Sequence, residues 1–373
     1  MILAASVALG FLTTLVGLPY ARRYLALSGI LGTDQQKPEK PKIPTSGGVA
    51  VLFGFLVSVT SYLGLSSFMA PQGVNVALIL AALSSVVIIS LIGLLDDIHV
   101  NLKVIVEEEL EVGTEGTRLD LREKVETVEP PHQRIWKRFT GENGENELRQ
   151  GLGQMTKMLF VLPAALPLIA VGAGSWSMTF PLIGTVNWGL MYPLVLLPLG
   201  LLFVSNVVNM LAGTNGLSAS TSLVASTSLG VFGYLNGSTE AALIAFSLSG
   251  ALLAFLYYNF YPASVLPGDS LTYLAGAAIF SATVIGNMER FAVFIFTPWI
   301  IEFFLKARSG FNARSWGDLQ EDGRLEPPYD RNYSLTHPLM RRGFSEPEIT
   351  LALAGMETLI CVTGLILFTG GVI

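Results

Sequence analysis

The stretch Ser205-Asn-Val-Val-Asn-Met-Leu-Ala-Gly-Thr-Asn-Gly-Leu217 places three carboxamides and two glycines where a strongly apolar run ends. On a helix, Asn206 and Asn209 are three residues apart and share one face. Gly213 and Gly216 then permit a sharp turn and a close approach of the backbone to a ligand. The pattern fits either a polar turn between two transmembrane helices or a ligand-binding loop at the membrane surface.

Composition identifies a membrane protein. The 373 residues are 51% hydrophobic and only 13% charged, against roughly 25% charged residues in a soluble domain. The sequence therefore predicts an all-α polytopic membrane protein of about ten transmembrane helices. The ten apolar runs are 2–20, 47–65, 75–95, 155–173, 188–208, 217–235, 240–258, 271–287, 291–306 and 349–371.

Basic residues are concentrated in alternate connections between these runs. Connections 21–46, 96–157 and 306–347 hold 21 of the chain's 22 Lys and Arg residues. The positive-inside rule places these connections in the cytoplasm and both termini outside. The short connections 209–216 and 259–270 then also face the cytoplasm. We predict a multi-pass protein of the plasma membrane whose polar clusters face the cytoplasm.

Charge and cysteine content exclude two further classes. The net charge of −6 gives no reason to expect a nucleic-acid partner, and the single cysteine, Cys361, excludes a disulfide framework. Arg22 and Arg23 follow the first apolar run instead of preceding it, which predicts an uncleaved first span.

A segment of different composition interrupts the apolar runs. Alternation in 103–106 and 119–122 predicts short strands, so this insert is expected to contain β-hairpins. Its basic and aromatic segment 134–139 fits either contact with anionic lipid or a solvated loop. The predicted parts are 1–101 with spans 1–3 and the first cytoplasmic loop, the insert 102–151, 152–306 with spans 4–9, the cytoplasmic loop 307–347 and 348–373 with span 10.

Two carboxylates end the third span. Asp96 and Asp97 lie at a helix C-terminus, where they oppose the helix dipole and each other. Solvated aspartates at the interface are one interpretation. We favour a charge-handling role, because ionisable groups at membrane depth are usually functional.

Other polar residues also allow two interpretations. Lys157 either snorkels to the interface or binds a phosphate oxygen. Asp269 is either the N-cap of the next span or a carboxylate beside free backbone N–H groups, where a metal-bound phosphate fits. In the last loop, Ser345 is predicted to cap the final span, with Glu346 and Glu348 supporting its first turn.

The clusters share a chemistry. Carboxylate and carboxamide oxygens suit Mg²⁺, which usually binds together with substrate phosphates, and basic residues suit a diphosphate. We interpret the chain as a membrane-face enzyme that uses Mg²⁺, or Mn²⁺ in its place, on a phosphorylated substrate. A transporter of lipid-linked sugars is the alternative, although its polar residues are expected near the bilayer midplane between repeats.

The motifs resemble those of the polyprenyl-phosphate N-acetylhexosamine-1-phosphate transferases. The resemblance covers about residues 33 to 350 without the insert. Such enzymes transfer a sugar 1-phosphate from a UDP-sugar to a polyprenyl phosphate and release UMP. The motifs are Gly93-Leu-Leu-Asp-Asp97, Asn206-x-x-Asn209-x-x-Ala-Gly-x-Asn215-Gly-Leu217 and Val265-Leu-Pro-Gly-Asp-Ser270, with Ile43-Pro-Thr-Ser-Gly-Gly48 and the loop of His337 in agreement.

The Ala-Gly-x-Asn-Gly-Leu version is similar to the UDP-GlcNAc:dolichyl-phosphate branch of eukaryotes and archaea, and Gly323-Arg-Leu-Glu326 is similar to it as well. The expected substrates are UDP-GlcNAc and dolichyl phosphate, and the expected source is archaeal. A bacterial-type undecaprenyl-phosphate transferase for another N-acetylated sugar remains an alternative. A homodimer is one assembly that the sequence leaves open.

The resemblance implies roles for individual residues. Asn209 and Asp269 would hold the metal, while Asp96 and Asp97 would receive or deprotonate the lipid phosphate and Lys157 would contact the diphosphate. The resemblance implies attack of the lipid phosphate on the UDP-sugar, either directly or through an aspartyl intermediate. The implied substrate-binding residues are Ser46, Gly47, Asn206, Gly213, Asn215, Leu266, Arg314 and His337, with Gly213 and Asn215 at the uracil.

Overall fold

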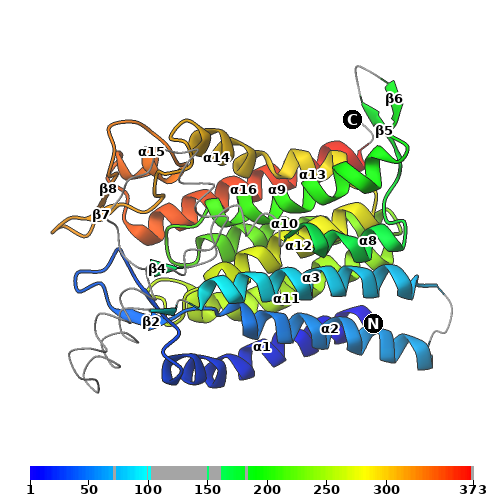
Figure 1. Cartoon of the computed structure of the whole chain (residues 1–373), viewed down its shortest axis with the longest axis horizontal. Helices are drawn as coiled ribbons and strands as arrows, with labels where there is room; N and C mark the ends of the chain where they lie inside the picture. The colour runs from blue at the N-terminus through cyan, green and yellow to red at the C-terminus, as the bar shows by residue number, and fades with distance from the viewer. Residues whose placement is uncertain (70–72, 99, 102–148, 151–160, 181–183, 371–373) are drawn as a thin grey trace, which may run out of the picture. The chain divides into compact units, whose positions relative to one another are not determined.

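The computed structural model describes residues 1–69, 73–98, 100–101, 149–150, 161–180 and 184–370. It is mostly helical (Figure 1). The α-helices are α1 (Ile2–Leu27), α2 (Gly48–Met69), α3 (Val76–Asp97), α8 (Leu166–Ala170), α9 (Leu197–Met210), α10 (Leu217–Leu235), α11 (Thr239–Asn259), α12 (Gly268–Ile285), α13 (Glu289–Ile295), α14 (Thr297–Ala307), α15 (Thr336–Met340) and α16 (Glu346–Thr369). Two other helical segments precede α8 and α9, a 3₁₀ turn η1 (Leu162–Ala165) and a π-helical turn η2 (Tyr192–Leu196).

The long helices form because apolar segments in a bilayer must satisfy their backbone hydrogen bonds internally. Among the described residues, seven helices are long and apolar enough to cross a membrane. The protein is therefore an integral multi-pass membrane protein. Helix α10 has the length of a span but is not among the seven, and its many serines and threonines lower its hydropathy.

The predicted runs correspond to the observed helices with two differences. The run 291–306 is divided at Phe296 into α13 and α14, and Pro298 lies in the first turn of α14. The run 155–173 lies partly outside the described residues, and its remainder forms η1 and α8. The number of ten spans and the outward position of both termini stay predictions.

The chain also forms short strands, which the all-α prediction placed only in the insert. In the described part of the chain they form four antiparallel two-stranded sheets. The predicted strands at 103–106 and 119–122 lie outside the described residues, although β3 and β4 pair just before and after that segment. The pairs are β1 (Leu31–Thr33) with β2 (Lys42–Pro44), β3 (Val100–Asn101) with β4 (Arg149–Gln150), β5 (Ser177–Phe180) with β6 (Gly184–Asn187), and β7 (Asp318–Leu319) with β8 (Leu325–Glu326).

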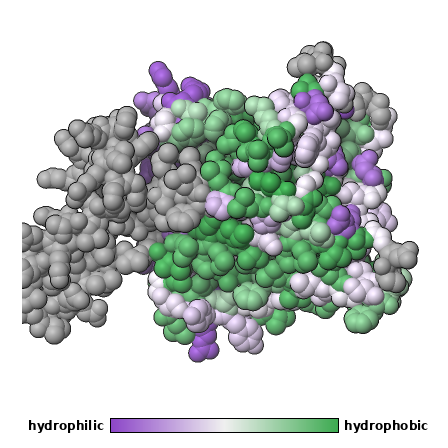
Figure 2. All heavy atoms as spheres, turned by 45° about the vertical axis from the view of Figure 1, so that its right-hand side comes forward, coloured by the Kyte–Doolittle hydropathy of each residue, from purple (hydrophilic) through white to green (hydrophobic). Residues whose placement is uncertain are grey.

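The chain divides into two compact units, Met1–Asp97 with Met158–Ile373, and Ile98–Lys157. In the first unit α12 is central, because 83% of its span is buried, against 22% for α1 and for α16. Helix α12 packs against α2, α3, α9, α10 and α11. On the face seen in Figure 2, hydrophobic side chains form a broad band with hydrophilic residues toward its edges.

Glycines let three helices approach α12 closely. A Cβ atom on Gly48 of α2 would lie 2.2 Å from the backbone nitrogen of Leu271, and one on Gly93 of α3 would lie 2.5 Å from the carbonyl oxygen of Asp269. Gly276 of α12 meets the backbone of α9 in the same way. Small residues at helix contacts are typical of packing in membranes. Here they place the beginning of α12 directly against the beginning of α2 and the end of α3.

Gly93→Ala tests this packing. We expect destabilisation by about 1–3 kcal/mol, because the added methyl group overlaps the backbone of α12 and cannot be relieved by a side-chain rotation. Gly64→Ala in α2 is the control, since no atom lies within 4 Å of its added Cβ. Thermal unfolding in detergent should show a lower melting temperature for Gly93→Ala only. Equal melting temperatures for the two variants would contradict the close approach.

Candidate functional site

The beginning of α12 is capped by a carboxylate from another helix. Asp97, at the end of α3, accepts the backbone N–H of Asp269 on Oδ1 at 2.7 Å and that of Ser270 on Oδ2 at 3.1 Å. Its Oδ2 also accepts the Ser46 hydroxyl at 2.9 Å. Asp269 itself lies inside the first turn, because the helix begins at Gly268. Its interpretation as the N-cap is therefore wrong, and Asp97 takes that role across the fold.

Two sequence motifs pair through their backbones beside this cap. The N–H of Leu266 donates to the carbonyl of Pro44 at 2.8 Å, and the N–H of Gly47 donates to the carbonyl of Leu266 at 3.0 Å. Ser46 adopts the left-handed conformation with φ +61°. This turn directs its hydroxyl to Asp97. Three predicted substrate-binding residues, Ser46, Gly47 and Leu266, thus form one edge of the site.

The predicted polar residues of α3, α9 and α12 gather around Tyr273. Its hydroxyl donates to Asn206 Oδ1 at 3.4 Å, and it interacts electrostatically with Asp269, Asp96 and Asp97. The other amide atom of Asn206 donates to the carbonyl of Leu202 in its own helix. The tertiary structure therefore brings the three predicted aspartates together beside the first predicted asparagine.

Asn209 lies at the same level as the beginning of α12. Ser205 of α9 meets Gly276 of α12, and one residue later Asn206 meets Tyr273. Because these contacts progress in opposite directions along the two helices, the last turn of α9 lies beside the first turn of α12. That arrangement places half-buried Asn209 level with Asp269.

The donor set fits a magnesium ion. Among the described residues, no three His, Cys, Asp or Glu side chains form a ready metal cluster. Asp269 and Asn209 offer carboxylate and amide oxygens, and Mg²⁺ commonly completes its shell with water and substrate phosphates. Asp97 is less suitable as a ligand, since its two oxygens already accept three hydrogen bonds. A metal here would therefore share its coordination with a bound diphosphate.

The loop after α9 is tied to two other loops by one amide. Gln36 is buried at 4% exposure. Its Nε2 donates to the carbonyl of Gly213, and its Oε1 accepts the N–H of Gly317 at 3.4 Å. A Cβ on Gly213 would lie 2.9 Å from the Cβ of Ser315, so glycine is required at this crossing. Gly213, a predicted substrate-binding residue, is thus held in position by contacts to its backbone.

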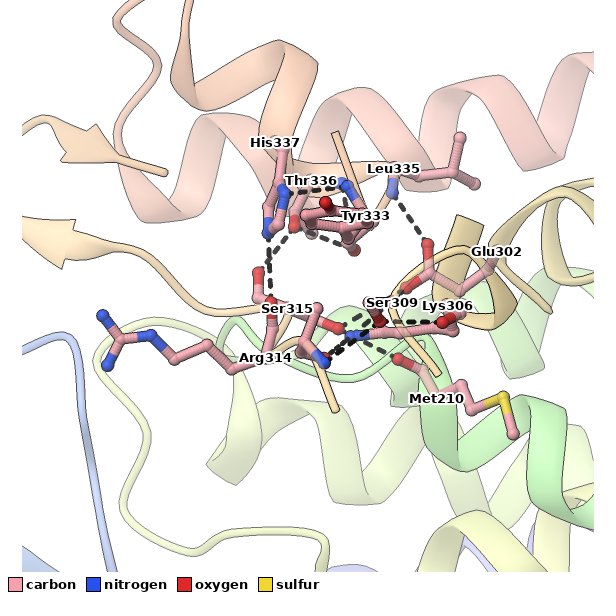
Figure 3. Close-up of polar contacts among 12 residues, drawn as sticks. Met210, Glu302, Lys306, Ser309, Arg314, Ser315, Tyr333, Leu335, Thr336 and His337 are labelled. Atoms are coloured by element: carbon pink, nitrogen blue, oxygen red, sulfur yellow. Dashed lines mark hydrogen bonds and ion pairs between the residues drawn. The ribbon is translucent and has the colours of Figure 1, made fainter. Parts of the chain in front are cut away.

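A buried acid organises the loop 307–347 (Figure 3). Glu302 of α14 has no exposed surface. Its carboxylate accepts the N–H of Leu335 at 2.7 Å and the hydroxyl of Ser315 at 3.5 Å. Lys306 lies 3.9 Å from Glu302 and donates to the carbonyl of Ala313 at 2.6 Å. The Ser315 hydroxyl also lies 3.1 Å from the carbonyl of Met210, which connects this cluster to the end of α9.

His337 and Arg314 have structural contacts in this loop. The fully buried His337 accepts the N–H of Tyr333 on Nδ1 at 3.2 Å, so its proton lies on Nε2, which donates to the carbonyl of Arg314 at 3.1 Å. The Arg314 guanidinium points away from the cluster (Figure 3). It pairs with Asp318 at 2.8 Å. The structure places both residues beside the site, and their predicted substrate contacts remain predictions. Predicted Lys157 lies outside the described residues.

Several buried polar residues were missed by sequence reasoning. Glu302 lies inside the run 291–306, where an acid in an apolar segment is itself a signal. Ser345 caps α16 as predicted, with Glu348 completing a capping box. Glu346, which was predicted to support the same turn, instead pairs with Lys37 from the first loop. No local pattern reveals that pair, because the two residues are far apart in sequence.

Comparisons with known proteins agree with this arrangement. A family model described as "Glycosyl transferase family 4" matches residues 147–287. A protein of Saccharolobus solfataricus is 30% identical over 92% of this chain and 89% of its own length, and one of Sulfolobus acidocaldarius is 29% identical over 98% and 95%. Both carry the name "Putative UDP-N-acetylglucosamine--dolichyl-phosphate N-acetylglucosaminephosphotransferase". A phospho-N-acetylmuramoyl-pentapeptide-transferase of Clostridium perfringens is 32% identical over 40% of this chain and 47% of its own.

Acidification tests the role of His337. Burial lowers the pKa of His337 below its ordinary value of 6.5, because a charged imidazole is poorly solvated there. The unfolded chain therefore takes up this proton first, so the contribution of His337 to stability is complete above about pH 6.5 and decreases as the pH falls below it. We expect the melting temperature to fall more between about pH 7.5 and 5.5 in the native protein than in His337→Gln. An equal fall would show that His337 is not the titrating group.

Proposed function

The chain belongs to glycosyl transferase family 4, the polyprenyl-phosphate N-acetylhexosamine-1-phosphate transferases, and from this premise we propose that it transfers GlcNAc-1-phosphate from UDP-GlcNAc to dolichyl phosphate or a similar polyprenyl phosphate. UMP is the second product. The reaction takes place at the cytoplasmic membrane face and begins the assembly of a lipid-linked oligosaccharide. The observation that carries the donor and acceptor is the nearly end-to-end similarity to two archaeal relatives named for this reaction.

The bacterial alternative has less support. The phospho-N-acetylmuramoyl-pentapeptide-transferase covers 40% of this chain. In addition, the motif Ala212-Gly-Thr-Asn-Gly-Leu217 resembles the version found in the dolichyl-phosphate branch. A transporter of lipid-linked sugars is disfavoured for a different reason, since the polar residues described above lie at the ends of helices and in loops at one end of the bundle.

In the direct route, which we favour, a phosphate oxygen of the lipid attacks the β-phosphorus of UDP-GlcNAc. The new P–O bond forms as the bond to the UMP oxygen breaks, and the electron pair leaves with UMP. Asp269 and Asn209 would hold Mg²⁺, which would supply positive charge for the diphosphate and its leaving oxygen. Lys157 adds a positive charge for the same phosphates in this proposal.

The adjacent aspartates have different roles in this scheme. Asp97 is a positioning residue, because both of its oxygens hold the beginning of α12 and the Ser46 turn. Asp96 is 5% exposed and interacts with Tyr273 beside Asp269. We therefore assign to Asp96 the contact with the lipid phosphate, from which it removes a proton or which it orients for attack.

Asparagine variants separate these two roles. Asp96→Asn should lose turnover by at least about a hundredfold while its melting temperature stays close to that of the native protein. Asp97→Asn should lower both, because its NH₂ group would face backbone N–H donors. A loss of one buried charged hydrogen bond costs about 1.5–3 kcal/mol. Asp322→Asn, on an exposed turn with a side chain 58% exposed, is the matched control. Near-normal turnover of Asp96→Asn would remove its assigned role.

The direct test of the function is UMP release by the purified full-length protein in detergent. We expect release with UDP-GlcNAc and dolichyl phosphate in the presence of Mg²⁺, and loss of release after treatment with EDTA. UDP-GalNAc and UDP-glucose define the donor, and undecaprenyl phosphate defines the acceptor. A stoichiometric burst of UMP without lipid would indicate the aspartyl intermediate instead of direct attack. No release with any donor from folded protein would reject the proposal.

A further inference from the structure

Asn215 is held by three segments that are distant from it in sequence. It follows α9, and its contacts come from the loop between β1 and β2, from the segment before α12, and from the first turns of α16. Asn215 is 6% exposed. Such complete fixation is unusual for a loop asparagine, because each ordered side chain loses rotamer freedom. The arrangement therefore calls for a function that depends on the orientation of this amide.

The side-chain oxygen of Asn215 is saturated. Its Oδ1 accepts the ammonium of Lys37 at 3.1 Å and the backbone N–H of Ala263 at 3.0 Å. Both partners are donors only, so the amide oxygen and not its NH₂ group must face them. An amide oxygen has two lone pairs, and both are used here. A flip of the amide would bring its NH₂ group against two donors.

Glu346 holds both the backbone of Asn215 and Lys37, whose ammonium group holds the amide oxygen. One of its carboxylate oxygens accepts the backbone N–H of Asn215 at 2.7 Å, and the other pairs with Lys37. The Asn215 carbonyl accepts the hydroxyl of Thr350 at 2.9 Å, one helical turn further along α16. Lys37 also lies 3.4 Å from Asp34. Backbone and side chain of Asn215 are thus held by one connected set of charges.

One group of Asn215 has no such contact. Its Nδ2 donates to none of the residues that the structure describes, and it is not one of the fully buried atoms that lack a hydrogen-bond partner, so solvent reaches it. Lys37 and Ala263, which hold the amide oxygen, line a cleft of about 350 Å³ at the protein surface. Asn215 therefore offers a ligand an accessible NH₂ donor of fixed direction, because its amide oxygen is already paired, and the resemblance implies the uracil of a UDP-sugar as that ligand.

We propose that Lys37 and Glu346 are positioning residues that make Asn215 a donor-only reader of the nucleotide base. This inference rests on the proposed function, which supplies a UDP-sugar as the ligand. A fixed NH₂ group donates to the 4-carbonyl oxygen of uracil and disfavours the 4-amino group of cytosine, because two donors then face each other. The Lys37–Asn215–Glu346 set thus selects uridine over cytidine nucleotides. A freely rotating amide would present its oxygen to cytosine and lose this selection.

Product binding tests the inference without relying on turnover. Isothermal titration calorimetry of the full-length protein in detergent with Mg²⁺ compares UMP with CMP. We expect the native protein to prefer UMP by at least about tenfold. Asn215→Asp replaces the NH₂ donor by an acceptor of the same size, and it should reverse the preference in favour of CMP.

A second pair of variants tests the positioning residues. Lys37→Met combined with Glu346→Gln removes both charges together, so that neither is left buried alone. The UMP-to-CMP ratio of dissociation constants should fall toward one in this double variant, a change that a merely stabilising role would not produce. Lys40→Met, an exposed lysine of the same loop, is the matched control and should keep the native ratio.

The outcomes separate this inference from the function on which it rests. Equal binding of UMP and CMP by the native protein, or an unchanged preference in Asn215→Asp, overturns the inference and leaves the transferase standing. A native ratio in the folded double variant overturns the role of Lys37 and Glu346. Binding of neither nucleotide by folded native protein overturns both the inference and the uridine-dependent function. If the double variant does not fold, Lys37→Met by itself tests the positioning role, with the same expected fall in the ratio.

Discussion

The arrangement of this site depends on one carboxylate, Asp97, that ends α3 and caps α12. Free backbone N–H groups at a helix start need acceptors, and here the acceptor comes from another helix. The same carboxylate holds the Ser46 hydroxyl, so α2, α3 and α12 are fixed to one another at one end of the bundle. An acid at a helix C-terminus is unfavourable by itself. Its cost is offset because the group lies at the positive end of the neighbouring helix.

A second constraint acts through the loops. Gln36 joins the loop after α9 to the loop 307–347, and Glu302 of α14 holds that second loop through the N–H of Leu335. The Lys37–Asn215–Glu346 set adds the beginning of α16. Buried hydrogen bonds and ion pairs keep these loops in place together with apolar loop residues, such as Leu325 and Met340, that pack into the core. Fixed polar groups of this kind are what recognition of a charged nucleotide requires.

Much of the site was accessible from local patterns. Apolar runs predicted the helices, and the carboxamide and aspartate motifs predicted the residues that meet around Tyr273. Three features were not accessible. Glu346 was interpreted only as a helix-start residue, Asp269 was given the alternative role of an N-cap, and Lys37 was counted only as a basic residue of the loop. Each depends on a partner more than fifty residues away, and spacing along a chain carries no information about such pairs.

The sequence by itself determined that the chain lies in a membrane, which segments form helices, and which oxygen-bearing residues are available at the helix ends. These properties depend on hydropathy and on local hydrogen bonding, both of which are encoded by neighbours. Only the tertiary structure decided that Asp97 caps α12 and that Lys37 donates to the side-chain oxygen of Asn215. Those contacts depend on which helix ends and loops lie next to each other. Close packing at Gly48, Gly93 and Gly276 places the ends of α2, α3 and α9 against α12.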